Sequence, residues 1–212
     1  MVIARKQTSG RGRFLRKWHS PEGGLWFSIL IKNIACMEKI WNYYSGLLYA
    51  EVKFLKKFGI KATLKWPNDV LVKGKKISGI LLESISRSSN FEVVIIGCGI
   101  NLHNEIPEEL SDKATNFISH CSKNTKLNKL IEEFFIILDK IFYQIDIMKI
   151  KFSEIVLNYF EGIGKRVTII SGKERFTGVI IGFTQKGEII MKSKNIIKKF
   201  STGELIDYYK KT

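Results

Sequence analysis

Cysteine is scarce in this chain. Its three cysteines, Cys36, Cys98 and Cys121, form no Cys-x-x-Cys pair and show no metal-ligand spacing. The sequence therefore predicts neither a disulfide framework nor a cysteine-based metal cluster. Because the cytoplasm keeps thiols reduced, we expect a cytoplasmic protein with free cysteines.

Long apolar runs are absent as well. Runs such as 93–96 and 134–138 are far shorter than the roughly 20 residues that cross a bilayer, and residues 1–10 hold no apolar core of signal-peptide length. We therefore expect neither a membrane span nor an export signal. The chain has 212 residues, of which 45% are hydrophobic. That content allows one substantial core and a small second unit, and it excludes a wholly disordered chain.

Acidic residues are few compared with basic ones. Lysine and arginine total 35 against 20 aspartates and glutamates, which gives a formal charge of +15. This charge predicts attraction to polyanions, namely nucleic acid, nucleotide phosphates or an acidic protein. Much of the lysine is spread along the chain, but six basic and no acidic residues lie from Arg5 to Lys17. This basic, glycine-containing segment is typical of a loop that binds phosphate.

Hydrophobic patterning predicts a chain with both helices and strands. Apolar residues recur at three- and four-residue steps over 37–58 and 127–147, which predicts two amphipathic helices, the first ended by Gly59. A further helix is expected over 152–160. Short apolar runs bounded by turn residues predict strands at 2–4, 25–31, 63–66, 70–72, 77–84 and 91–96, with a hairpin-type turn at Lys73-Gly74-Lys75.

The pattern changes after Gly162. Four short β-rich runs, separated by glycines and turn residues, follow at 166–170, 177–183, 188–192 and 196–200. Strands at this spacing predict a small barrel that depends on the main domain for part of its stability. We therefore expect two domains, 1–162 and 163–212.

The first motif is Gly10-Arg11-Gly12-Arg13, followed by Arg16, Lys17 and Trp18. Glycine lets the backbone approach a ligand closely, and arginine supplies forked donors for carboxylate or phosphate. A solvated basic loop and an RNA-binding segment are the competing interpretations. Trp18 fits either a core position or a stacking partner for a purine.

The second motif is Lys65-Trp66-Pro67-Asn68-Asp69, with Lys76 and Gly79 downstream. Pro67 favours extended geometry at Trp66, so a strand ends in a rigid turn that presents Asn68 and Asp69. Lys65 and Lys76 could then reach one anionic centre, while Asp69 holds a lysine or a metal ion. An ordinary polar turn is the alternative for these residues taken alone.

These motifs together resemble the signature blocks of the biotin–protein ligases. The blocks are 7–13 with Lys17-Trp18, then 65–69 with 76–81, then Gly97-Cys98-Gly99-Ile100-Asn101-Leu102. The second block, with Lys76 eleven residues after Lys65, is highly specific, since lipoate ligases share the fold but usually lack it. The resemblance implies an α+β fold with a mixed sheet and flanking helices, of the class II synthetase-like or biotin–lipoate ligase type, followed by a small SH3-like β-barrel.

The resemblance also implies a role for each matched residue. The catalytic residues would be Lys76, Arg11, Arg13 and Asp69. Biotin would be bound by Gln7, Gly10, Arg11, Arg13, Lys76 and Gly79. ATP and the adenylate would be bound by Arg13, Trp18, Lys65, Asn68 and Asn101. No metal ligand is expected among the side chains, because Mg²⁺ would be bound mainly through ATP.

The activity that the resemblance implies is ATP-dependent ligation of biotin. Biotin would be activated as biotinyl-5′-AMP and transferred to a lysine of a biotin carboxyl carrier domain of a carboxylase. No helix-turn-helix precedes the first motif, so we expect no specific DNA binding, and a homodimer is possible. Family members carry a helix and a Ser/Thr-containing turn that contacts biotin ahead of this point, so we expect a chain starting at Met1 to have an incomplete biotin pocket.

Three alternatives stay open at this stage. The shared fold allows a ligase for lipoate or another carboxylic acid. The missing turn allows a truncated, inactive paralogue. The charge of +15 allows a nucleic-acid-binding module without catalytic activity.

Overall fold

A six-stranded sheet forms the centre of the larger part of the protein. The computed structural model describes residues 1–34, 36–87, 90–121 and 125–206. The strand order is β1-β2-β6-β5-β4-β3. The strands are β1 (Val2–Ala4), β2 (Leu25–Ile34), β3 (Ala62–Lys65), β4 (Asp69–Val72), β5 (Lys75–Arg87) and β6 (Asn90–Ile100).

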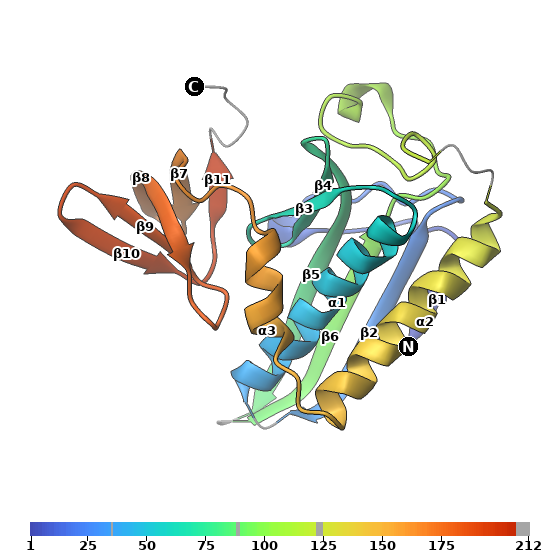
Figure 1. Cartoon of the computed structure of the whole chain (residues 1–212), viewed down its shortest axis with the longest axis horizontal. Helices are drawn as coiled ribbons and strands as arrows, with labels where there is room; N and C mark the ends of the chain where they lie inside the picture. The colour runs from blue at the N-terminus through green and yellow to red at the C-terminus, as the bar shows by residue number, and fades with distance from the viewer. Residues whose placement is uncertain (35, 88–89, 122–124, 207–212) are drawn as a thin grey trace.

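Two long helices cover one face of this sheet (Figure 1). Helix α1 spans Met37–Lys57 and helix α2 spans Leu127–Asp146. Both confirm the helices expected from periodicity, and Gly59 follows α1 with a φ of +76°, the left-handed conformation that ends a helix. Their apolar stripes meet the sheet in one core, where side chains such as Leu47, Phe54 and Phe134 are completely buried.

The third predicted helix is shorter than expected. Helix α3 spans Phe152–Ile155, and a 3₁₀ turn, η3 (Val156–Tyr159), replaces its second half. Phe160 then forms a parallel bridge with Leu64, and the Glu161 amide donates to the Leu64 carbonyl at 2.8 Å. This tertiary pairing with β3 turns the chain out of the helix, which periodicity alone does not reveal. The other 3₁₀ turns are η1 (Arg13–Leu15) and η2 (Glu108–Leu110).

Strand β6 runs further than the sequence predicted. We expected it to stop at residue 96, but it continues through Gly97, Cys98 and Gly99. Pairing with β2 on one side and β5 on the other keeps this glycine-rich stretch extended, with Gly99 opposite both Trp26 and Gly79. The hairpin turn is confirmed, since Lys73 and Gly74 both have positive φ.

The sheet differs from the mixed pairing that we expected. All pairs between named strands are antiparallel, because short turns join most neighbouring strands. Parallel pairing appears in two isolated bridges, Leu64 with Phe160 and Lys76 with Ala114. The α+β class, with helices flanking a sheet, is confirmed.

A second antiparallel sheet follows, beside α3 in Figure 1. Its strand order is β10-β9-β8-β7-β11. The strands are β7 (Arg166–Ser171), β8 (Glu174–Phe183), β9 (Ile189–Ser193), β10 (Ile196–Phe200) and β11 (Glu204–Ile206). The β-rich character after residue 162 is thereby confirmed, although β11 was not anticipated. The SH3-like assignment and the division at 162/163 stay predictions.

Two tryptophans contact the turn between β8 and β9 of the second sheet. The Trp66 indole donates from Nε1 to the Gly187 carbonyl at 2.8 Å, and the Trp41 ring lies so close to Gly187 that a Cβ there would sit 2.0 Å from it. Phe160 and Phe183 pack with their ring centroids 4.7 Å apart. The second sheet is thus packed against α1 and the segments that follow β3 and η3. In the described ranges, no helix is long and apolar enough to span a membrane.

The core predicts a large loss of stability for Phe54→Ala. Phe54 is fully buried and packs against Phe58, Phe117 and Phe134, so truncation should cost about 3–5 kcal/mol through lost burial and a residual cavity. Urea unfolding followed by circular dichroism measures this. Ile136→Ala, 45% exposed on α2, is the control and should change stability by no more than about 0.5 kcal/mol. Equal losses would contradict this packing.

Candidate active site

A cavity of about 540 Å³ lies where the basic loop, the ends of β4–β6 and the second sheet meet. Its floor is the sheet face opposite the helices, because Cys98 faces Glu51 of α1 and its strand neighbours Gly97 and Gly99 point the other way. A volume of this size suits a small-molecule substrate. Arginines and lysines outnumber carboxylates along its wall, so the cavity favours anionic ligands.

Ten of the eleven predicted site residues line this one cavity. They are Gln7, Arg11, Arg13, Trp18, Lys65, Asn68, Asp69, Lys76, Gly79 and Asn101. Gly10 does not line it. A Cβ at Gly10 would lie 2.4 Å from Ser20 Oγ and 2.6 Å from the Trp18 carbonyl, so this glycine lets the loop fold back on itself.

Two paired glycines make the floor. Gly79 and Gly99 are register partners on β5 and β6. The Trp18 indole lies directly on them, since a Cβ at Gly99 would be 2.5 Å from Trp18 Nε1. The indole also meets Trp26 edge-on, with ring centroids 6.3 Å apart. Trp18 is therefore held at the cavity floor by its glycine contacts.

Lys76 and Asp69 form the charged centre of the cavity. Lys76 Nζ lies 2.6 Å from Asp69 Oδ1 and 5.0 Å from the centre of the Trp18 ring. The amine also lies over Gly79, where a Cβ would be 2.8 Å from it. Lys65 lines the same cavity, and burial lowers its pKa, although nearby Asp69 acts in the opposite direction. Lys76 lines the cavity with 27% of its side chain exposed, so its amine is accessible to a ligand there.

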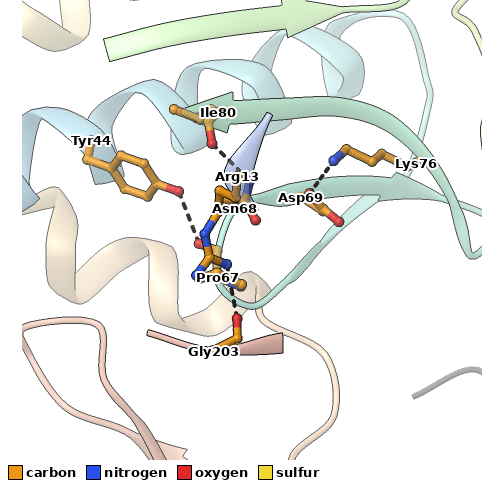
Figure 2. A network of polar contacts seen from close by, with 8 residues as sticks. All are labelled: Arg13, Tyr44, Pro67, Asn68, Asp69, Lys76, Ile80 and Gly203. Carbon is orange, nitrogen blue, oxygen red and sulfur yellow. Dashed lines mark hydrogen bonds and ion pairs between the residues drawn. The ribbon is translucent and has the colours of Figure 1, made fainter. Parts of the chain in front are cut away.

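Two arginines of the basic loop contact the second sheet. Arg13 donates to the Gly203 carbonyl at 3.1 Å and to Thr202 Oγ1 at 2.8 Å, and Arg16 forms an ion pair with Glu204. Figure 2 shows the Arg13 guanidinium between the Pro67–Asn68 turn and Gly203, with Lys76 pointing toward Asp69. Burial lowers the pKa of Arg13, whereas the hydrogen bond to Glu204 raises that of Arg16 and lowers that of Glu204. The loop is therefore fastened across the cavity mouth.

The remaining predicted residues also form ion pairs and hydrogen bonds within the protein. Arg11 pairs with Glu83 at 3.0 Å in an exposed ion pair, which contributes little stability. Asn68 Nδ2 donates to the Ile80 carbonyl at 2.9 Å, and Asn101 Nδ2 to the Thr115 carbonyl at 3.0 Å. Gln7 accepts a hydrogen bond from Ser20 at 2.7 Å. These contacts stabilise the segments that carry the charged groups of the cavity.

Sequence reasoning missed the wall that the second sheet supplies. Gly203, Glu204 and Leu205 line the cavity although they lie nearly 190 residues after the basic loop. No local pattern marks them, and β11 itself was not predicted. Arg16 stood in the first motif, so its charge could have suggested an acidic partner but not which one.

The chain was then compared with known proteins. Residues 1–101 match the Biotin/lipoate A/B protein ligase family. The bifunctional ligase/repressor BirA of Bacillus subtilis is 32% identical over 213 residues, covering 97% of this chain and 65% of the relative. The biotin--[acetyl-CoA-carboxylase] ligase of Paracoccus denitrificans is 35% identical over 104 residues, covering 48% of this chain and 43% of the relative.

The structural comparison agrees. The biotin protein ligase from Aquifex aeolicus in complex with biotin and ATP matches with a TM-score of 0.74 and 30% identity, covering 96% of this chain and 86% of that one. Fold and cavity together define a protein of the biotin/lipoate ligase class. Because the Aquifex match spans most of both chains, the chain belongs to the biotin–protein ligase family. It spans about two thirds of the length of the Bacillus relative.

The glycine floor predicts that Gly99→Ala displaces Trp18. A methyl group at Gly99 would stand 2.5 Å from the indole, whereas one at Gly97 would meet ordinary contacts at 3.7 Å. In fluorine NMR of protein labelled with 5-fluorotryptophan, the resonance that disappears in Trp18→Phe should shift in Gly99→Ala. The Gly97→Ala control should leave it in place. An unchanged resonance in both variants would mean that Trp18 does not rest on Gly99.

Proposed function

We propose that this protein is an ATP-dependent biotin–protein ligase. The observation that carries the proposal is one cationic cavity that combines Lys76, Asp69 and the loop arginines in a member of this family. Biotin's carboxylate would attack the α-phosphorus of ATP, giving biotinyl-5′-AMP and releasing pyrophosphate. The carrier lysine would then attack the acyl carbon, lose a proton and release AMP.

The first step brings two anions together, so positioning and positive charge are its main requirements. Lys76 lines the cavity, and its amine would bridge the carboxylate and the α-phosphate. Arg13 and Arg11 would bind carboxylate and phosphate from the loop. Trp18, with Asn101 on the neighbouring wall, would hold the adenylate. Gln7 and Gly79 would contact biotin.

The second step requires a neutral amine on the incoming lysine. Asp69 is our candidate to orient or deprotonate it. The carboxylate already holds Lys76 at 2.6 Å, which supports an orienting role. Once Lys76 has turned toward the anhydride, Asp69 would be free to accept a hydrogen bond from the carrier amine.

We propose that Mg²⁺ enters with ATP as part of the substrate. The described residues contain no group of three or more His, Cys, Asp or Glu side chains that could hold a metal ion. The triphosphate would therefore supply most of the ligands, with Asp69 the nearest carboxylate to Lys76. When bound, the ion would neutralise the pyrophosphate leaving group.

The proposed partner is a biotin carboxyl carrier domain of a carboxylase, in line with the name of the Paracoccus relative. A homodimer and a cytoplasmic location are also proposed. Cys36 and Cys98 are free thiols, which suits a reducing compartment.

A ligase for lipoate or another acid is the second candidate, because the matching family includes lipoate ligases. ATP–pyrophosphate exchange with biotin, lipoate and octanoate offered separately decides between them. Exchange that depends on biotin supports the proposal, whereas exchange with lipoate or octanoate in place of biotin would transfer the assignment to the second candidate.

Lys76→Ala should lower the rate of biotin-dependent ATP–pyrophosphate exchange about 10²–10³-fold, because a preorganised charge at the reacting phosphate is lost. Its effect on ATP binding, measured by calorimetry, should be much smaller. Lys75→Ala is the matched control, since the Lys75 amine donates to the Ser111 carbonyl. That variant should retain nearly full exchange. Comparable losses of exchange in the two variants would contradict a specific role of Lys76 in the reaction.

Arg13→Gly should let the adenylate escape, because the loop loses its two hydrogen bonds to Thr202 and Gly203. Biotin would then appear on lysines of a bystander protein such as serum albumin, detected with labelled streptavidin. Arg5→Gly, which breaks only an exposed ion pair with Glu22, is the control and should not label albumin. If the Arg13→Gly variant retained the adenylate, the basic loop would not be the element that holds it in the cavity.

A further inference from the structure

A carboxylic acid is buried directly behind the cavity floor. Glu51 lies in the middle of α1 and is 1% exposed. It faces β5 and β6 from the helix side, where the Cys98 thiol donates to Glu51 Oε1 at 3.1 Å. None of the predicted roles uses this residue.

The residues around Glu51 belong to the same strands as the floor. Ser78, 1% exposed, immediately precedes Gly79 on β5, and Cys98 immediately precedes Gly99 on β6. Since side chains alternate along a strand, Ser78 and Cys98 face the helix and the two glycines face the cavity. Glu51 therefore accepts a hydrogen bond from β6 and lies close to Ser78 of β5, behind the floor.

The glycine floor needs support from that side. Gly79 and Gly99 have no side chains to pack against each other, yet Lys76 and Trp18 approach them more closely than a Cβ would allow. A small movement of either strand would displace both groups. The position of the cavity floor thus depends on what holds β5 and β6 on the helix side.

The surroundings of Glu51 favour its neutral form. Burial raises the pKa of Glu51 to about 7, although the nearby Ser78 hydroxyl, the hydrogen bond from Cys98 and the charge of Lys76 across the sheet act in the opposite direction. Burial also raises the pKa of Cys98 and of the neighbouring Tyr44, so both stay protonated. The remaining charged group that acts on Glu51 is Asp69, whose negative charge favours the neutral acid.

A proton on Glu51 also completes its contacts. Glu51 Oε2 and the Ser78 hydroxyl each lack a well-formed hydrogen bond within the ranges that the structure describes. A protonated Oε2 could donate to Ser78 while Oε1 accepts from Cys98. Ionisation would place a negative charge at a position that is 1% exposed, and desolvation disfavours it there.

We propose that Glu51 is a positioning residue acting from behind the floor, whose neutral carboxyl ties β5 to β6 and whose ionisation weakens the binding of anionic substrates. The inference rests on the proposed function. Loss of the proton places a negative charge one strand's thickness from the site where biotin's carboxylate and the phosphates would bind.

The test is the pH profile of the KM for biotin in ATP–pyrophosphate exchange. In the wild type, KM should rise roughly tenfold from about pH 6 to about pH 8.5, because a like charge has appeared beneath the substrate. Glu51→Gln keeps the shape and stays neutral, so its KM should change less than about twofold across the same range. A parallel rise in both proteins would overturn the proposal.

Stability supplies a readout that does not depend on catalysis. A carboxyl whose pKa is raised on folding lowers stability as pH increases from its unfolded value through its folded value. The thermal midpoint of Glu51→Gln relative to the wild type should therefore be higher at about pH 8.5 than at about pH 5. A pH-independent difference would overturn the proposal. If the wild type shows no biotin-dependent exchange at any pH, the proposed function fails while this readout still tests Glu51.

A second variant covers the case in which Glu51→Gln does not fold. Cys98→Ala removes a donor that stabilises the charged carboxylate, so the rise in KM should move to higher pH. A rise that stays at the wild-type pH would contradict the role assigned to Glu51.

Discussion

The close approach of Trp18 and Lys76 to bare backbone at Gly79 and Gly99 is the constraint on which the site depends. A Cβ at Gly99 would stand 2.5 Å from Trp18 Nε1 and one at Gly79 would stand 2.8 Å from Lys76 Nζ, so the indole or the amine would have to move. The two glycines lie opposite each other because β5 and β6 pair in one register over their length. The core that α1 and α2 form behind the sheet holds that register, so the apolar packing of the helices determines the position of the charged groups.

Part of the charge of the basic loop is explained by acceptors that lie near the end of the second sheet. Arg11 pairs with Glu83 on β5, whereas Arg13 and Arg16 bind the hydroxyl, carbonyl and carboxylate of the consecutive residues 202–204. A run of cations that would repel one another is thereby spread around the cavity mouth. The cavity keeps an excess of positive charge, which is the electrostatic condition for binding a carboxylate next to a triphosphate.

Much of this arrangement could be predicted from the sequence, and the reasons differ by element. Periodicity located α1 and α2 because each buries one continuous stripe against the sheet. The ordered motifs, through their resemblance to the biotin–protein ligases, located ten cavity residues. The extension of β6 through Gly97–Gly99 could not be predicted from the local sequence, since cross-strand pairing overrides the weak strand preference of glycine.

The contacts of Arg13 and Arg16 with residues 202–204 escaped prediction because these residues are nearly 190 positions apart in the sequence. Glu51 escaped because glutamate usually lies at the surface, although its spacing from Leu47, Leu48 and Leu55 places it on the apolar stripe of α1.

The most direct test of the account is transfer of biotin to a carrier by the full chain. The protein is incubated with ATP, Mg²⁺, biotin and a biotin carboxyl carrier domain, and the carrier is probed with labelled streptavidin. We predict a labelled carrier that depends on ATP and biotin and that is lost in Lys76→Ala but kept in Lys75→Ala. An unlabelled carrier with folded wild-type protein, or equal labelling by the Lys76→Ala variant, would contradict the assignment of this cavity as a biotin-ligating site.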